Sequence, residues 1–88
     1  MTREEISSLA DEHDLEDVLL ADGFEDAFIG FAERCAAKPV AVYDFAKAVD
    51  ALVKRDGMSE EEAEEYLHFN VLGAYVGEQT PWFVTVTR

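Results

Sequence analysis

A carboxylate and an imidazole stand three residues apart in Glu65-Tyr66-Leu67-His68, and Glu61 lies one helical turn earlier. Side chains at this spacing share a helix face and could hold a metal, as in di-iron bundles, which need two such motifs and two further glutamates. One chain carries one motif, so only a symmetric dimer could complete a site. We therefore expect a solvated acidic helix face with one polar histidine, no metal and no cofactor.

The acids between Asp11 and Asp17 could also suggest a calcium loop. That loop needs oxygen ligands at alternate positions, a central glycine and a bidentate glutamate at its twelfth position. Here His13 and Leu15 interrupt the alternation and the central glycine is missing. The spacing therefore argues against calcium.

Cys35 is the only cysteine, and nucleophilic catalysis needs a base held beside the nucleophile. No nucleophile elbow, Gly-rich oxyanion loop, Walker motif or dinucleotide motif accompanies it. We expect a buried, structural Cys35 and no enzymatic activity. A lone thiol also excludes an intramolecular disulfide, so we expect a reducing, cytoplasmic environment.

Residues 73–81 are rich in glycine and polar side chains and lie between a predicted helix and a predicted strand. Aromatic side chains on shaped loops make good anchors, which makes Tyr75, Glu78 and Trp82 candidate partner-binding residues. The interpretation that we favour is a tight connection in which the glycines satisfy the backbone geometry. Tyr75 and Trp82 would then pack on the core.

The net charge of −13 comes from 20 acidic and 7 basic residues. This balance argues against direct contact with nucleic acid or anionic membranes, and it suits a solvated surface, a high-salt cytoplasm or a basic protein partner. A sharper hypothesis is that the carboxylates imitate a phosphate backbone and occupy the basic groove of a nucleic-acid-binding protein. The carboxylates expected in that contact are Glu4, Asp11, Glu16, Asp17, Glu61 and Glu65.

Local signals predict the elements that position the first of these residues. Thr2 and Glu5 form a capping-box pattern and predict a helix over residues 3–12. Asp14 predicts the start of a second short helix that ends at Gly23. Residues 1–26, with ten acids, would therefore be an acidic helical segment.

Two apolar runs, at residues 27–31 and 40–43, flank a turn-like connector and predict an antiparallel hairpin. The competing interpretation is a helix with good periodicity through Phe24, Phe28, Phe31 and Cys35. Residues 82–87 alternate in polarity and predict a terminal strand.

An αα-hairpin is predicted between these strands. Asp44 should cap a helix over residues 45–55 that Gly57 ends, and Ser59 with Glu62 should start a second helix that runs to about residue 72. Leu52 and Leu67 should be buried between the two helices. The second helix is expected to direct Ala63, Tyr66, Leu67, Asn70 and Val71 inward.

These elements predict an α+β fold in a single domain, residues 1–88. A small antiparallel sheet, made of the hairpin and the C-terminal strand, would be backed by the αα-hairpin within residues 27–88. The apolar content of 49% is sufficient for a core, which a homodimer interface could extend. The N-terminus lacks the pattern of a secretory signal, and no apolar run has the length of a membrane span.

Several segments of the second half carry a resemblance to a known group. They are Val42-Tyr43-Asp44, Asp56-Gly57-Met58-Ser59, Glu62-Ala63, Phe69-Asn70, Gly73-Ala74-Tyr75-Val76-Gly77-Glu78 and Thr80-Pro81. With them, residues 39–84 resemble a family of small uncharacterised proteins of bacteriophages, prophages and bacterial mobile elements. The resemblance implies no activity. It implies a genomic neighbourhood in which small acidic proteins are accessory factors or inhibitors of host defence.

Charge and resemblance together predict a non-enzymatic acidic binding protein of phage or mobile-element type. In its most concrete form, the protein inhibits a nucleic-acid-binding host defence protein, such as a CRISPR or restriction component, by nucleic-acid mimicry in the host cytoplasm. The alternative is a structural or oligomeric accessory protein whose acidic surface serves only solubility. A metal-dependent enzyme is the third hypothesis.

Overall fold

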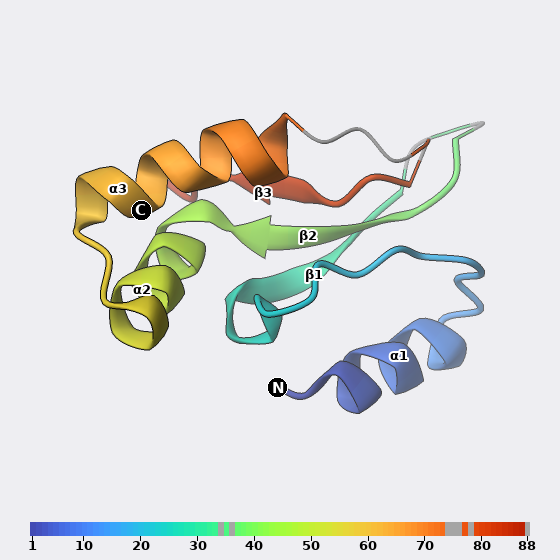
Figure 1. The fold of residues 1–88 in the computed structure, drawn as a ribbon. Helices are drawn as coiled ribbons and strands as arrows, with labels where there is room; N and C mark the ends of the chain where they lie inside the picture. Colours follow the sequence, from blue (N-terminus) through green and yellow to red (C-terminus); the bar gives the residue numbers. More distant parts are fainter. Residues whose placement is uncertain (34, 36, 74–76, 78, 88) are drawn as a thin grey trace.

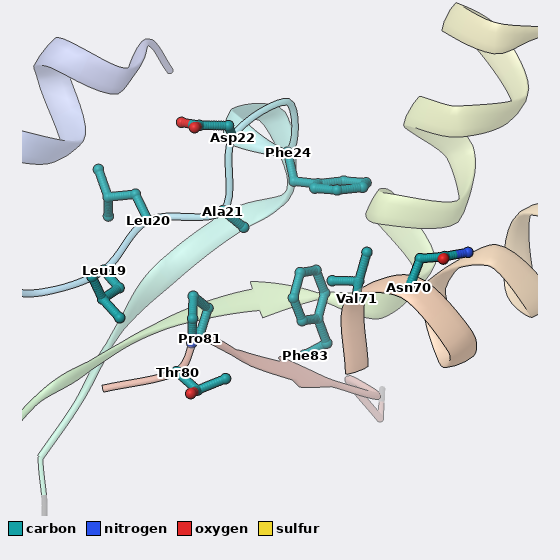
Figure 2. A pocket seen from close by; sticks show the side chains of 10 residues that line it. All are labelled: Leu19, Leu20, Ala21, Asp22, Phe24, Asn70, Val71, Thr80, Pro81 and Phe83. Carbon is teal, nitrogen blue, oxygen red and sulfur yellow. The ribbon is translucent and has the colours of Figure 1, made fainter. Parts of the chain in front are cut away.

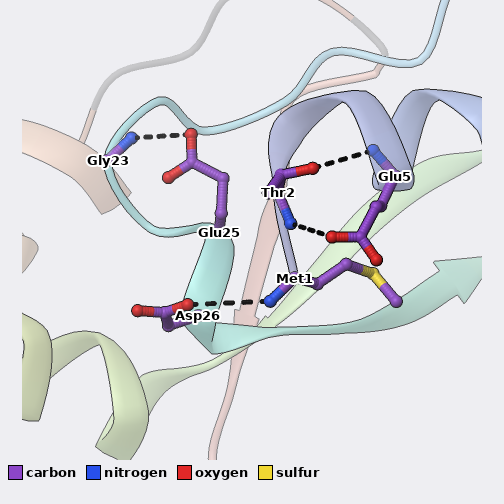
Figure 3. Close-up of polar contacts among 6 residues, drawn as sticks. All are labelled: Met1, Thr2, Glu5, Gly23, Glu25 and Asp26. Atoms are coloured by element: carbon purple, nitrogen blue, oxygen red, sulfur yellow. Dashed lines mark hydrogen bonds and ion pairs between the residues drawn. The ribbon is translucent and has the colours of Figure 1, made fainter.

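The computed structural model describes residues 1–33, 35, 37–73, 77, 79–87 (Figure 1). The first helix, α1 (Arg3–Glu12), forms where the capping box predicted it. The Thr2 hydroxyl accepts from the Glu5 amide at 3.2 Å, and the Glu5 carboxylate accepts from the Thr2 amide at 3.0 Å (Figure 3). These two bonds satisfy donors that a helix start leaves unpaired. Hydrogen bonding from the Thr2 backbone amide, and then from the Thr2 side chain, lowers the pKa of the Glu5 carboxyl, because these donors favour its charged form.

The second short helix predicted to start at Asp14 does not form. Asp14 and Asp17 instead take left-handed backbone conformations, with φ of 55° and 58°. Aspartate tolerates this region better than most residues, but helices of L-residues do not continue through it. The residues that follow are extended, so Val18 and Leu20 are half-buried while Leu19 between them is exposed.

A hairpin follows a single 3₁₀ turn, Glu25–Ala27. Strands β1 (Phe28–Ala32) and β2 (Val40–Asp44) pair antiparallel, with a register shift between Phe28 and Gly30. The hairpin interpretation is therefore confirmed, and the competing helix is wrong. β2 is the central strand of the sheet, so its residues are buried on both sides, apart from a half-buried Val42.

The predicted αα-hairpin is confirmed as α2 (Phe45–Asp56) and α3 (Glu60–Tyr66), which continues as a π-helical segment, Leu67–Leu72. Asp44 caps α2 by accepting from the amides of Ala46 and Lys47 at 2.9 and 3.3 Å. Gly57 ends α2 with a φ of 69°, which costs glycine little. Ser59 starts α3 with the expected capping box.

The buried stripe of the second helix is narrower than predicted. Ala63 and Leu67 are fully buried, and Leu52 of α2 lies in the same hydrophobic cluster. The prediction that Tyr66 and Asn70 turn inward is wrong, because both side chains are exposed. Ala63 and Leu67 are four residues apart and face the core. Tyr66 and Asn70 each lie three residues after one of them, and their side chains lie beyond the edge of the buried face.

Strand β3 (Trp82–Val84) pairs with β2 in parallel, so the sheet is mixed and not purely antiparallel as predicted. The fold class, α+β, is confirmed. Figure 1 shows the reason for the parallel pairing: α3 runs back along the sheet, so β3 starts at the same end of the sheet at which β2 begins. The strand is also shorter than the predicted 82–87 segment.

Tyr43 is the largest fully buried side chain, and it organises the core. Its ring stacks on Phe83 of β3 at 5.2 Å between centroids, and the ring of Phe28 meets it edge-on at 5.8 Å. Its hydroxyl accepts from the Ala21 amide at 2.9 Å, which ties the extended segment after α1 to the sheet. Burial raises the pKa of the Tyr43 hydroxyl, an effect that the Ala21 hydrogen bond partly opposes.

Replacing Tyr43 with phenylalanine should cost about 1–3 kcal/mol at neutral pH, because the partly buried Ala21 amide loses its acceptor. Since the folded state raises the pKa of this hydroxyl above its usual value of 10.0, its protonation favours folding below that pH, and the contribution is lost at higher pH. The difference in unfolding free energy between wild type and Tyr43→Phe should therefore shrink above about pH 10. Urea unfolding at pH 7 and at several alkaline pH values measures it. The exposed Tyr66→Phe is the control and should leave the alkaline profile unchanged.

Candidate functional site

Carboxylates gather where α1 ends. Asp11, Asp14, Glu16 and Asp17 are all exposed, and with Leu15 they line one hollow of about 340 Å³. The two left-handed aspartates turn the chain back on itself, and this turn brings the carboxylates of the helix end and of the following segment together. Glu4 is exposed as well and lies two turns before Asp11 on α1. We call these five residues the N-terminal acidic surface.

Ion pairs neutralise other acids of this region. Arg3 pairs with Asp22, and the amino group of Met1 lies 3.7 Å from the Asp26 carboxylate (Figure 3). Across the described part of the chain, no ion pair involves Asp11, Glu16 or Asp17. Their charges therefore face solvent.

The predicted α3 carboxylates lie elsewhere. Glu61 and Glu65 are exposed and four residues apart, so they share one face of α3. α1 and α3 lie on opposite sides of the sheet in Figure 1. The two predicted sets of carboxylates are thus separate surfaces, and the fold does not join them into one.

The metal-binding hypothesis finds little geometric support. Among the described residues, no group of three or more His, Cys, Asp and Glu side chains could hold a metal ion. The ring of His68 lies 5.4 Å from the ring of Phe45, centroid to centroid. Cys35 is exposed in the connector between β1 and β2, so the prediction of a buried, structural cysteine is wrong. The connector lies outside the apolar runs, which explains its exposure.

The loop before β3 acts as a structural connection through Gln79. This side chain is only 7% exposed, and its amide nitrogen donates to the carbonyl oxygens of Glu16 at 3.0 Å and of Pro39 at 3.1 Å. One side chain thereby joins three segments that are distant in sequence. Tyr75 and Glu78 lie outside the described residues.

Trp82, the remaining predicted partner-binding residue, is 45% exposed in β3. It pairs with Val42 across the sheet. Within the favoured interpretation of a structural connection, the prediction that Trp82 packs in the core is therefore wrong. Its indole is available to solvent.

An apolar cavity that the sequence did not indicate lies between the extended segment, the π-helical segment and β3 (Figure 2). Its volume is about 490 Å³, and Phe24, Val71 and Phe83 point toward one another within it. The rings of Phe24 and Phe83 meet edge-on at 5.8 Å. The full lining is residues 19–22 with Phe24, residues 70–71, and Thr80, Pro81 and Phe83.

A second hollow, of about 300 Å³, lies beside the first and shares Asn70 with it. Phe69 lines it and is 80% exposed, the largest exposure among the large hydrophobic side chains of the described chain. Tyr66 lines it too and is 40% exposed. The remaining lining residues are Met58, Glu62, Glu65 and Asn70. The spacing of Tyr66 and Phe69, three residues apart, is a signal for this face, but the hydrophobic periodicity of the helix predicts Tyr66 in the core.

Comparisons with protein-family models, with curated proteins and with solved structures each find no match for this chain. The resemblance to phage and mobile-element proteins therefore stays a prediction. Within the described residues, no helix is long and apolar enough to cross a membrane.

Proposed function

We propose that this chain is a non-enzymatic binding protein whose N-terminal acidic surface contacts a basic surface of a partner that itself binds nucleic acid. The observation that carries the proposal is the hollow at the end of α1, where Asp11, Asp14, Glu16 and Asp17 are exposed together. Desolvating such a cluster is favourable only when cations replace the lost water. A Lys- or Arg-lined groove supplies those cations, and grooves of this kind are what nucleic-acid-binding proteins present to phosphates.

The net charge of −13 supports the same kind of partner. A strongly negative field accelerates encounter with a basic protein and disfavours nucleic acid itself. The resemblance to phage and mobile-element proteins favours, as partner, a host defence protein of CRISPR or restriction type. The protein would then act by occupying the groove that the nucleic acid needs.

Affinity purification from the native host identifies the partner, and competition then tests the mechanism. Binding should weaken steeply as salt rises, and DNA or RNA should displace the protein. The triple variant Asp11→Asn, Glu16→Gln, Asp17→Asn should weaken binding by about tenfold or more, chiefly by slowing association. Asparagine suits position 17 because it tolerates the left-handed conformation observed there. Surface plasmon resonance at several salt concentrations measures these effects.

The matched control removes three carboxylates that belong neither to the N-terminal acidic surface nor to the Glu61 and Glu65 face of α3. Its substitutions are Glu33→Gln, Asp50→Asn and Asp56→Asn. This variant has the same net charge as the first and should bind nearly as wild type does. Equal losses of affinity in both variants would mean that overall charge, and not the N-terminal acidic surface, causes the effect. A partner that binds nucleic acid and this protein simultaneously, with affinity indifferent to salt, would contradict mimicry and leave the acids a solubilising role.

A further inference from the structure

Two hollows lie beside the end of the second helix. They are the mainly apolar cavity between Phe24, Val71 and Phe83 and the mixed hollow beside Tyr66 and Phe69, and Asn70 lines both of them. We call these two hollows together the aromatic groove. The cavity is lined mainly by apolar side chains although the chain has a charge of −13, and soluble proteins seldom leave large apolar patches without a use.

The cavity end of the groove has walls from three segments that are distant in sequence (Figure 2). The Tyr43 hydroxyl holds one wall by its hydrogen bond to Ala21, and the Phe24–Phe83 ring contact spans two of the segments. The cavity is thus formed within the folded chain itself. Its volume of about 490 Å³ lies within the range of about 300–1,000 Å³ that binding pockets occupy.

The other end of the groove combines aromatic rings with carboxylates. Phe69 and Tyr66 are exposed, and Glu62 and Glu65 line the same hollow. Glu62 accepts from the Ser59 amide, whereas Glu65 forms no ion pair among the described residues. Aromatic faces and carboxylates both attract cations, and an arginine can stack on a ring while it binds a carboxylate. The chemistry of this end favours a guanidinium or ammonium group.

A second copy of the chain would fit this surface poorly. In a two-fold dimer each patch meets itself, so the Glu62 and Glu65 carboxylates of one copy would approach those of the other. Like charges across an interface are unfavourable, and the two copies together would carry twice the charge of −13. None of the residues that line the two hollows is Lys or Arg. Arg55 of the chain lies over the ring of Phe24, 5.8 Å from its centroid, at the far end of the groove from Glu62 and Glu65, so a basic partner would supply the cations for these two carboxylates.

We propose that the aromatic groove binds a basic amphipathic segment of a protein partner. Apolar side chains of the segment enter the cavity between Phe24, Val71 and Phe83. An arginine or lysine lies on the rings of Tyr66 and Phe69, within reach of Glu65. The inference rests on the proposed function only for the basic character of the partner, and it assigns a different surface from the acids at the end of α1.

Synthetic peptides provide the probe. The first is a 14-residue helical peptide with leucines on one face and arginines on the other. Its two relatives replace every arginine by glutamine or every leucine by serine. Titration of the ¹⁵N-labelled protein should give shifts centred on Phe69, Asn70, Val71 and Phe83 with the first peptide. Each relative should bind at least about tenfold more weakly, because each lacks one of the two recognised features.

Two variants of the protein test the residues. Phe69→Ala and Glu65→Gln change exposed side chains, so both should fold as wild type, and each should weaken the first peptide by about tenfold. The matched controls are Ile29→Ala, another exposed apolar side chain, and Glu64→Gln, an exposed acid on the same helix. Both controls should bind the peptide as wild type does.

Three results would overturn the inference. Phe69→Ala could bind the peptide as tightly as wild type, or the shifts could map to the end of α1. Alternatively, the signals of the same residues could shift when the protein concentration alone is raised, which would make a second copy the occupant.

The N-terminal triple variant should leave peptide affinity unchanged within about twofold. If the peptide binds as predicted but nucleic acid displaces the protein from no partner, the proposed function fails and this inference stands.

Discussion

Replacing Gln79 with glutamate is expected to leave much of the protein unfolded at neutral pH. The native amide nitrogen donates to the carbonyl oxygens of Glu16 and Pro39, and the side chain is buried. A carboxylate cannot donate and would meet both carbonyl oxygens with a negative charge. An uncompensated buried charge costs about 3–5 kcal/mol. A chain of this length has a total stability of roughly 4–13 kcal/mol, so the loss is a large fraction of it.

The sign of the pH dependence identifies the cause. Burial beside two carbonyl oxygens should raise the pKa of the introduced carboxyl in the folded state. A raised pKa in the folded state means that the deficit is smallest below the unfolded value, about 4.3, and grows as pH rises through the folded value. The protonated carboxyl can also donate one hydrogen bond. Urea unfolding of wild type and Gln79→Glu from pH 4 to pH 8 should show a widening gap.

Gln79→Leu is the matched control. It removes the donor without adding charge, so it should cost about 1–3 kcal/mol for the unsatisfied carbonyl groups, with no dependence of the difference on pH. If Gln79→Glu were as stable as wild type at pH 7, the amide would not join the three segments. Equal pH profiles for the two variants would likewise contradict the assigned role.

Leu67→Ala should destabilise the protein by about 2–5 kcal/mol. Leu67 is fully buried in the cluster that also contains Leu52 of α2, Ala63 of α3 and Tyr43 of β2. Truncation removes buried methyl groups and leaves a cavity where helix and sheet meet. Because Leu67 lies within a fully buried, packed cluster, the site has little freedom to collapse. Chemical denaturation gives the free energy, and the slope with denaturant should stay near that of wild type.

Leu67→Met keeps the volume and should cost less than about 1.5 kcal/mol. Glu64→Ala, on the exposed face of the same helix, should change stability by no more than about 0.5 kcal/mol. An unchanged melting temperature for Leu67→Ala would contradict the packing of the second helix against the core. The three variants together separate loss of packing from loss of helix propensity.

Helix starts were predictable because each depends on a few neighbouring residues. The pairs Thr2 with Glu5 and Ser59 with Glu62, and the lone Asp44, bind amides within three positions of themselves. Such contacts form in the same way whatever the rest of the chain does. The β1–β2 hairpin and the burial of Leu52 and Leu67 followed from hydrophobic periodicity, which also acts locally.

The errors arose where a distant segment competes with a local preference. Residues 14–22 have helical spacing, but the Ala21 amide bonds to Tyr43 and the Glu16 carbonyl to Gln79, and an extended backbone makes both contacts. The direction of β3 depends on the end of the sheet at which the helix before it ends. That geometry is set by packing between elements, and no motif within residues 82–84 encodes it.

The site divides in the same way. Charge is a sum over residues, so the sequence was sufficient to establish a surplus of acids, which argues against direct binding of nucleic acid. Position is a property of the folded chain: α1 and α3 lie on opposite sides of the sheet in Figure 1, and the cavity end of the aromatic groove takes its walls from three segments up to about 60 residues apart. Leu67 is buried in the core and Val71 is half-buried. Phe69 lies between them in sequence, on the opposite face of the helix, and is therefore exposed. A pattern of hydrophobic residues cannot distinguish a core position from an interface position, since both exclude water and only the neighbouring elements determine which one is already filled.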